Sequence, residues 1–266
     1  MKKFWGFLLV IVLMTSCGEY QSLLKSNDYN LDYKKAIEYY NKGDYQRAMN
    51  LLDGVRSVFV GQAKAQNIAY YRAFCSYNMK DYQIASDLFK QFIQTYPESS
   101  FAEECLYMMG FCDYKASPKP RLDQQVTEKA IREFQLYLSR YPYSMRKDKV
   151  NTYMDEMRDK LSYKAYLSAK NYYLREHYKA AVISLQNCLK DYPGSKYREE
   201  IMYMLFVSKY QMAVNSVEDK KVERYNNARE EYYYFADEYP NSRYAADVKK
   251  MYEDIEAYLE NYKFED

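Results

Sequence analysis

Residues 163–193 read YKAYLSAKNYYLREHYKAAVISLQNCLKDYP, and this segment has the pattern of one helix pair. Tyr166 and Tyr173 are seven residues apart, about two helical turns, so they share one face of a first helix. A polar turn follows, and the second helix carries Ala181 with a large apolar residue one turn later on its packed face. Pro193 ends the second helix because proline cannot continue one.

The same pattern recurs along the chain. Tyr-Pro-X-Ser segments begin at Tyr96, Tyr141, Tyr192 and Tyr239, and each proline lies twelve residues after an alanine. The tyrosine pairs spaced by seven recur in the preceding helices: Tyr33 and Tyr40, Tyr70 and Tyr77, Tyr107 and Tyr114, Tyr166 and Tyr173, Tyr203 and Tyr210. Their first members are separated by 37, 37, 59 and 37 residues. Repetition at this period predicts stacked supersecondary units.

Insertions account for the places where the period is longer. The interval of 59 residues contains a Pro-rich loop around Ser117 to Pro120. It also contains a charged segment, Lys147 to Ser162, which lacks Pro and Gly and is expected to extend the following helix. A further insertion around Val217 to Val222 is predicted to be a loop.

The short turns, such as Gly43-Asp44-Tyr45, together with the later proline resemble the tetratricopeptide repeat. The resemblance predicts an all-α fold, a right-handed α-solenoid of about five such helix pairs. The expected repeats are residues 32–60, 66–97, 101–142, 147–193 and 197–240, and a helix over 243–262 caps the array.

First helices line the concave face of such arrays, which places the tyrosine pairs in a groove. The candidate peptide-binding residues are Tyr33, Tyr40, Tyr70, Phe74, Tyr77, Tyr107, Phe111 and Tyr114. A second interpretation stays open, in which the tyrosines pack between repeats. The chain has 35 tyrosines, whose rings are apolar and whose hydroxyls are polar, so either interpretation suits them.

The N-terminus is typical of a secreted lipoprotein. Residues 1–16 combine basic Lys2 and Lys3, a short apolar stretch and small residues, as a signal peptide does. The sequence before Cys17 resembles a lipobox, which implies cleavage before Cys17 and its acylation; an ordinary signal peptide with an incidental cysteine is the alternative. Residues 17–31 are expected to contain the anchor and a tether, with the protein on the periplasmic face of the outer membrane.

The residues needed for catalysis are sparse. Lys+Arg 39 against Asp+Glu 37 leaves little net charge for nucleic acid binding. His177, the one histidine, falls in a turn, and no phosphate loop or metal motif is present, so we expect no enzyme, cofactor or metal site. Four cysteines are expected as buried packing residues, while a bridge between Cys75 and Cys112 stays open.

Two segments, Leu106 to Phe111 (LYMMGF) and Tyr163 to Pro193, resemble the BamD family of outer-membrane lipoproteins, although Met109 replaces the family's arginine. The resemblance implies an assembly factor that helps to fold and insert β-barrel proteins. It implies capture of unfolded substrate segments near the N-terminal repeats. It also implies docking to the periplasmic domains of the β-barrel assembly subunit through the C-terminal repeats, with Tyr166, Tyr173, Tyr203 and Tyr210 as candidate residues.

Two other functions fit the repeats and the anchor. A general envelope scaffold could serve division, motility or peptidoglycan synthesis. A glycan-binding lipoprotein would use the aromatic side chains as platforms for sugars.

Overall fold

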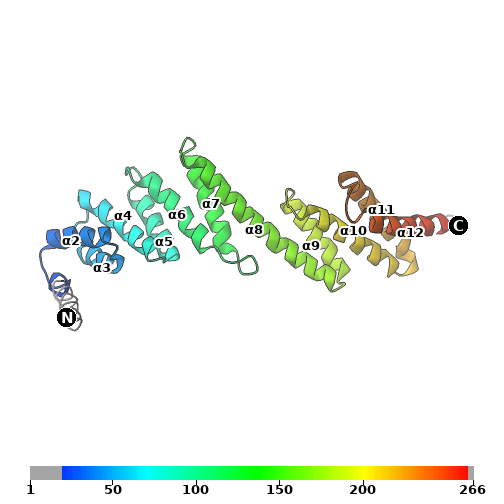
Figure 1. Cartoon of the computed structure of the whole chain (residues 1–266), viewed down its shortest axis with the longest axis horizontal. Coiled ribbons are helices and arrows are strands. Elements are labelled where there is room, and N and C mark those ends of the chain that lie inside the picture. Colours follow the sequence, from blue (N-terminus) through cyan, green and yellow to red (C-terminus); the bar gives the residue numbers. More distant parts are fainter. Residues whose placement is uncertain (1–19, 263–266) are drawn as a thin grey trace, which may run out of the picture. The chain divides into compact units, whose positions relative to one another are not determined.

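The computed structural model describes residues 20–262, and every regular element among them is helical (Figure 1). The signal peptide and Cys17 lie outside the described residues. The helices are α2 (Tyr29–Asn41), α3 (Tyr45–Val55), α4 (Ala63–Asn78), α5 (Tyr82–Thr95), α6 (Ala102–Ala116), α7 (Gln125–Arg140), α8 (Lys147–Leu174), α9 (Tyr178–Asp191), α10 (Arg198–Val214), α11 (Glu218–Glu238) and α12 (Ala245–Tyr262). The long α8 contains the charged segment that was expected to extend a helix.

The helices group into two compact units. The N-terminal unit contains residues up to Pro118 and Asp123–Met157, and the C-terminal unit contains Lys119–Leu122 and the chain from Arg158 onward. The boundary falls within α8, so this one helix contributes residues 147–157 to the first unit and residues 158–174 to the other.

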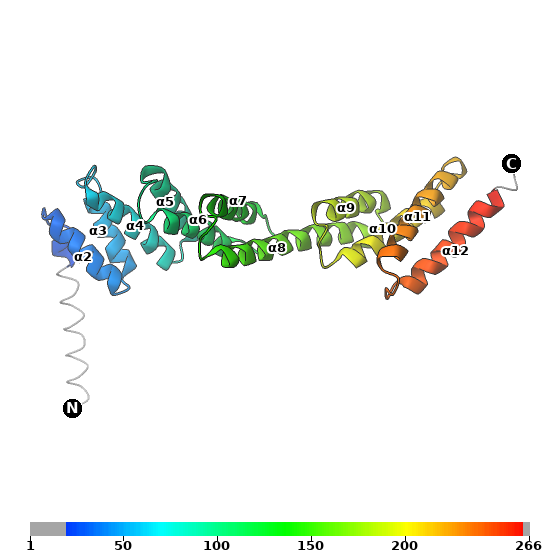
Figure 2. The same cartoon turned by 90° about the horizontal axis from the view of Figure 1, so that it is seen from above.

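In the N-terminal unit, consecutive helices pack as the pairs α2/α3, α4/α5 and α6/α7, in blue to green in Figures 1 and 2. The repeat alanines Ala48, Ala85 and Ala130 have no exposed surface, so neighbouring helices approach closely there. Phe89 and Phe134, one turn further on, are also fully buried. The alanine-plus-four pattern therefore identifies the core of the repeats.

In the C-terminal unit, consecutive helices from α9 to α12 also pack on one another, shown in yellow to red in Figure 2. Ala181 and Ala228 are fully buried, and Leu185 packs beside the first of them. The capping helix α12 buries Ile255 and Leu259 against α10 and α11.

The short turns inside the pairs share one backbone conformation. Gly43, Lys80 and Glu176 occupy equivalent positions and have φ of 81°, 67° and 59°. Glycine adopts this left-handed region freely, whereas lysine and glutamate do so at a cost. The repeat turn is thus maintained even where glycine is missing.

Two segments differ from the sequence-based expectation. Residues 20–23, expected as tether, form a helical turn whose Tyr20 and Leu23 are buried against the first pair. The Tyr20 hydroxyl accepts a 3.0 Å hydrogen bond from Asn50, which helps to order the turn. The loop predicted for Val217 to Val222 is wrong, because α11 begins at Glu218. A 3.0 Å ion pair between Lys221 and Glu218 supports its first turn.

Candidate binding surfaces

The hydroxyls of the predicted tyrosine pairs connect consecutive repeats. Four of these hydroxyls donate a hydrogen bond to a carboxylate on the helix that begins the next repeat or, for Tyr203 and Tyr210, on the capping helix α12. The bonds are Tyr70 to Glu104 (2.8 Å), Tyr114 to Glu156, Tyr203 to Asp247 (2.6 Å) and Tyr210 to Asp254 (3.2 Å). Burial raises the pKa of Tyr70 and Tyr203, so these hydroxyls stay protonated and act as donors.

In four of the five pairs, all but Tyr33 and Tyr40, the ring of the first tyrosine is also covered by the next repeat. The covering residue is always the fifth after the tyrosine of the Tyr-Pro turn. The ring contacts are Tyr70 with Phe101 (4.6 Å), Tyr166 with Tyr197 (4.4 Å) and Tyr203 with Tyr244 (4.0 Å), and the Arg146 guanidinium lies 4.8 Å from the Tyr107 ring centre. Tyr107 and Tyr166 are consequently buried, with 7% and 5% of their surfaces exposed.

Other members of the candidate set remain half-buried and form a continuous surface. We call Phe74, Tyr77, Phe111, Tyr114 and Tyr153 the aromatic band; it crosses α4, α6 and the first half of α8 in the N-terminal unit. Ring centres along it are 6.4, 6.2, 5.9 and 4.5 Å apart. Tyr153 was not predicted, because it falls in the insertion, outside the repeat frame. Lys115 lies 5.2 Å from the Phe111 ring, so the band is apolar with a basic edge.

Tyr33 and Tyr40 lie at the N-terminal end, where their rings pack against aromatic residues of the first two helix pairs. Tyr33 packs 6.1 Å from Phe59, and Tyr40 packs 4.9 Å from Tyr71. The structure thus brings Phe74, Tyr77, Phe111 and Tyr114 together and sets Tyr33 and Tyr40 apart from them.

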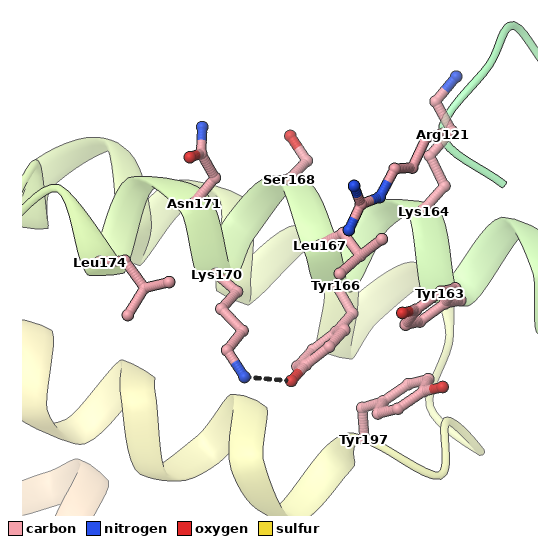
Figure 3. A pocket seen from close by; sticks show the side chains of 10 residues that line it. All are labelled: Arg121, Tyr163, Lys164, Tyr166, Leu167, Ser168, Lys170, Asn171, Leu174 and Tyr197. Carbon is pink, nitrogen blue, oxygen red and sulfur yellow. Dashed lines mark hydrogen bonds between the residues drawn. The ribbon is translucent and has the colours of Figure 1, made fainter.

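The C-terminal unit contains a hollow of about 790 Å³ along α8 (Figure 3). Tyr163 and Tyr166 stack against Tyr197, with ring centres 5.3 and 4.4 Å away. Lys170 points toward α10, where its ammonium donates to the Tyr166 hydroxyl at 2.8 Å and to Glu200 at 2.7 Å. These two bonds raise the pKa of Lys170.

The charged side chains that line this hollow are all basic: Arg121, Lys164 and Lys170. Arg121 comes from the α6–α7 loop, and Lys164 fixes that loop by donating to the Leu122 carbonyl at 2.8 Å. An aromatic wall beside basic groups suits an anionic or aromatic side chain of a partner protein. Among the predicted docking residues, Tyr166 belongs to this wall, while Tyr173 packs between the core clusters on either side of it.

The residues considered for chemistry occupy structural positions. His177 is exposed and precedes α9, and Cys75, Cys105, Cys112 and Cys188 are buried and unpaired, as expected for packing residues. Burial raises the pKa of the Cys188 thiol to about 11, which keeps it protonated at neutral pH. Within residues 20–262, His, Cys, Asp and Glu side chains do not gather in threes as a metal site would require.

None of the helices in the described part of the chain combines the length and apolar composition needed to span a bilayer. A family model named YfiO, described as outer membrane lipoprotein, matches residues 26–200 and again residues 165–265. The chain belongs to this family, which is the BamD family. The two matched ranges overlap over residues 165–200, which include most of the fourth predicted repeat. Such an overlap agrees with a chain built from similar repeats.

A search of curated proteins found no match to this YfiO family member. Two similar solved structures are described as tetratricopeptide proteins. The TPR2AB domain of yeast Sti1, in complex with pHSP90, is 14% identical, with coverage of 86% of this chain and 98% of that one and a TM-score of 0.39. A TPR repeats protein from Bacteroides fragilis is 13% identical, with coverage of 87% and 99% and a TM-score of 0.42.

The family-like segment LYMMGF has a packing role in this YfiO protein. A Cβ added at Gly110 would lie 2.9 Å from Cδ1 of the buried Phe134. Glycine therefore lets α7 approach α6 closely. The motif builds the core behind the aromatic band, and Phe111 is its member on the band itself.

Proposed function

We propose that this protein is a lipid-anchored adaptor that helps to fold and insert outer-membrane β-barrel proteins. Membership of the YfiO family over most of the chain carries the proposal. Acylated Cys17 would hold the protein on the periplasmic face of the outer membrane. In this proposal the aromatic band binds the substrate, and the basic hollow along α8 binds the assembly subunit.

The aromatic band is the proposed substrate surface. An unfolded β-barrel strand presents alternating aromatic residues, which can stack on half-buried rings. Phe74 and Phe111 suit this role because their rings carry no polar group. The Tyr77 hydroxyl, unlike that of Tyr70, has no hydrogen-bond partner among the described residues. Substrate capture would therefore use ring faces and edges, while the inter-repeat hydrogen bonds keep the helices in register.

The basic hollow of the C-terminal unit is the proposed docking surface for the periplasmic domains of the barrel-assembly subunit. Its aromatic wall offers apolar contact, and Arg121 and Lys164 attract acidic side chains of that subunit. Tyr203 and Tyr210 hold α10, which carries the Lys170 partner Glu200, against α12.

Affinity purification from solubilised outer membranes, through a C-terminal tag, tests the assignment. We expect recovery of a large β-barrel protein with periplasmic repeat domains. Arg121→Glu should reduce this recovery severalfold, while Arg175→Glu, an exposed charge in the turn after α8, should leave it unchanged. Recovery of division, motility or cell-wall proteins in its place would favour the general scaffold and exclude the assembly role.

The substrate surface has its own test. Tyr77→Leu with Phe111→Leu retains apolar packing and removes two aromatic faces. We expect the Kd for a peptide from the C-terminal strand of an outer-membrane β-barrel protein to rise about tenfold. Tyr234→Leu, which removes an exposed tyrosine outside the band, is the control. Equal affinity for all three proteins would exclude the band as the binding surface.

A further inference from the structure

The four Tyr-Pro-X-Ser turns are equivalent by position, yet one has a different surface. The residue after proline and the residue after serine are Glu98 and Ser100, Gly194 and Lys196, and Asn241 and Arg243 in three turns. In the turn between α7 and α8 they are Tyr143 and Met145. Polar or small residues are thus replaced by two large apolar ones at a single place in the array.

Tyr143 and Met145 are fully exposed, at 97% and 103%, whereas the other exposed large apolar side chains of the described chain reach at most 74%. The turn that carries them is well anchored. Ser144 donates to Glu103 at 2.7 Å, and its hydroxyl lies 2.5 Å from that of Tyr137. Two large apolar side chains are therefore presented outward from a fixed backbone.

Charge distinguishes the same turn. Residues 139–149 contain Arg140, Arg146, Lys147 and Lys149 against one acidic residue, a net charge of +3. The equivalent windows 94–104, 190–200 and 237–247 carry −3, 0 and −2. The turn with the exposed apolar tip is therefore also the turn with a basic surround.

We propose that the turn of residues 142–146 inserts its tip into an anionic lipid surface, as a second membrane contact beside the acyl anchor. Methionine and tyrosine suit the boundary between headgroups and acyl chains, and the basic surround is attracted to anionic headgroups. The family is described as outer membrane lipoprotein, and a protein with a lipid anchor stays close to the bilayer that holds the anchor. The inference rests on the proposed membrane anchoring and is independent of barrel assembly.

A tryptophan reporter tests the contact in the lipidated, full-length protein. The only native tryptophan is Trp5, in the segment expected to be removed, so Tyr143→Trp provides a single probe, and the parent protein gives the baseline. The matched control is Asn241→Trp, at the equivalent position of another turn. Both are measured on floated vesicles of phosphatidylcholine with about a quarter phosphatidylglycerol, with and without brominated acyl chains.

We expect brominated lipid to quench the fluorescence of the tryptophan at position 143 at least about twofold more than that of the tryptophan at position 241. The emission of the tryptophan at position 143 should also be shifted to the blue. Adding Lys147→Gln and Lys149→Gln should reduce the quenching, and phosphatidylcholine alone should do the same. Equal quenching of the two tryptophans would overturn the proposal. That result would also be expected if residue 143 contacts a partner protein and not the membrane. Because only floated vesicles are measured, a failure of the anchor is seen as failure to float.

Discussion

The hydroxyl of Tyr70 on α4 donates a 2.8 Å hydrogen bond to Glu104 on α6, the first helix of the next pair. The Tyr70 ring meanwhile packs 4.6 Å from Phe101, in the turn before α6. One side chain thus supplies both the apolar contact and the polar contact between two repeats. The same arrangement recurs at Tyr203, whose hydroxyl donates to Asp247 and whose ring packs on Tyr244.

Removing only the Tyr70 hydroxyl isolates the polar contact. Tyr70→Phe should lower the free energy of unfolding by about 1 kcal/mol, because Glu104 loses a donor while the ring stays packed. Urea unfolding followed by circular dichroism measures the change. Tyr234→Phe, on an exposed tyrosine, should change stability very little. Equal midpoints for the two variants would show that the bond contributes nothing to stability.

Two glycines in helices should respond to alanine with opposite signs. Gly110→Ala places a Cβ 2.9 Å from the ring of buried Phe134 and should destabilise by roughly 1–3 kcal/mol. Gly54→Ala in α3 meets nothing within 4 Å and should stabilise by up to about 1 kcal/mol, because alanine favours the helix. Thermal unfolding of the two variants checks the signs, and stabilisation by Gly110→Ala would contradict the close approach of α6 and α7.

The repeat turn offers a second matched pair. Lys80 has a left-handed φ of 67°, so Lys80→Gly should stabilise by up to about 1 kcal/mol. Gly43→Ala, at the equivalent turn with φ of 81°, should destabilise by a similar amount. Urea midpoints measure both. A loss of stability in Lys80→Gly would mean that backbone strain is not stored at this turn.

A buried charged cluster gives the protein a predicted pH dependence. Lys129 lies 2.8 Å from Asp113 and 3.7 Å from Glu133, and Ser86 donates to Asp113. Burial, with the neighbouring Asp113 carboxylate, raises the pKa of Glu133 to about 8 from an ordinary value of 4.5. The folded state therefore binds this proton more tightly than the unfolded chain does.

The stability contributed by Glu133 is complete below about pH 4.5 and is lost as the pH rises through about 8. Between pH 5 and pH 9 we expect the native protein to lose on the order of 4 kcal/mol that Glu133→Gln does not lose, because a pKa difference of one between the folded and unfolded states corresponds to about 1.4 kcal/mol. Glu128→Gln, on an exposed carboxylate of the same helix, is the control. Parallel stability curves for the native protein and Glu133→Gln would exclude the raised pKa.

Local patterns predicted the helices well. Ala85 with Phe89, and Ala130 with Phe134, mark buried helix faces because their spacing matches one helical turn. The Tyr-Pro turns follow helix ends because proline stops a helix, as at Thr95 and Asp191. These inferences need only the chain's own geometry, so one sequence sufficed.

Contacts between repeats were harder to predict. The spacing of seven placed Tyr70 and Tyr77 on one helix face. It could not show that Tyr70 has a carboxylate partner, Glu104, on the next repeat and that Tyr77 has none among the described residues. Tyr153 was missed because it lies in the insertion, and the start of α11 was missed because an extra segment was interpreted as a loop. Tertiary packing of Tyr20 likewise ordered a segment whose composition resembled a tether.

The amount of folded β-barrel protein in the outer membrane after depletion of this lipoprotein tests the assembly role most directly. It is measured by the heat-dependent gel mobility of folded barrels, with other outer-membrane lipoproteins as the control. We predict that folded barrels fall severalfold while the other lipoproteins stay constant. Unchanged folded barrels, with defects confined to division, motility or the cell wall, would contradict the assembly role and favour the general scaffold.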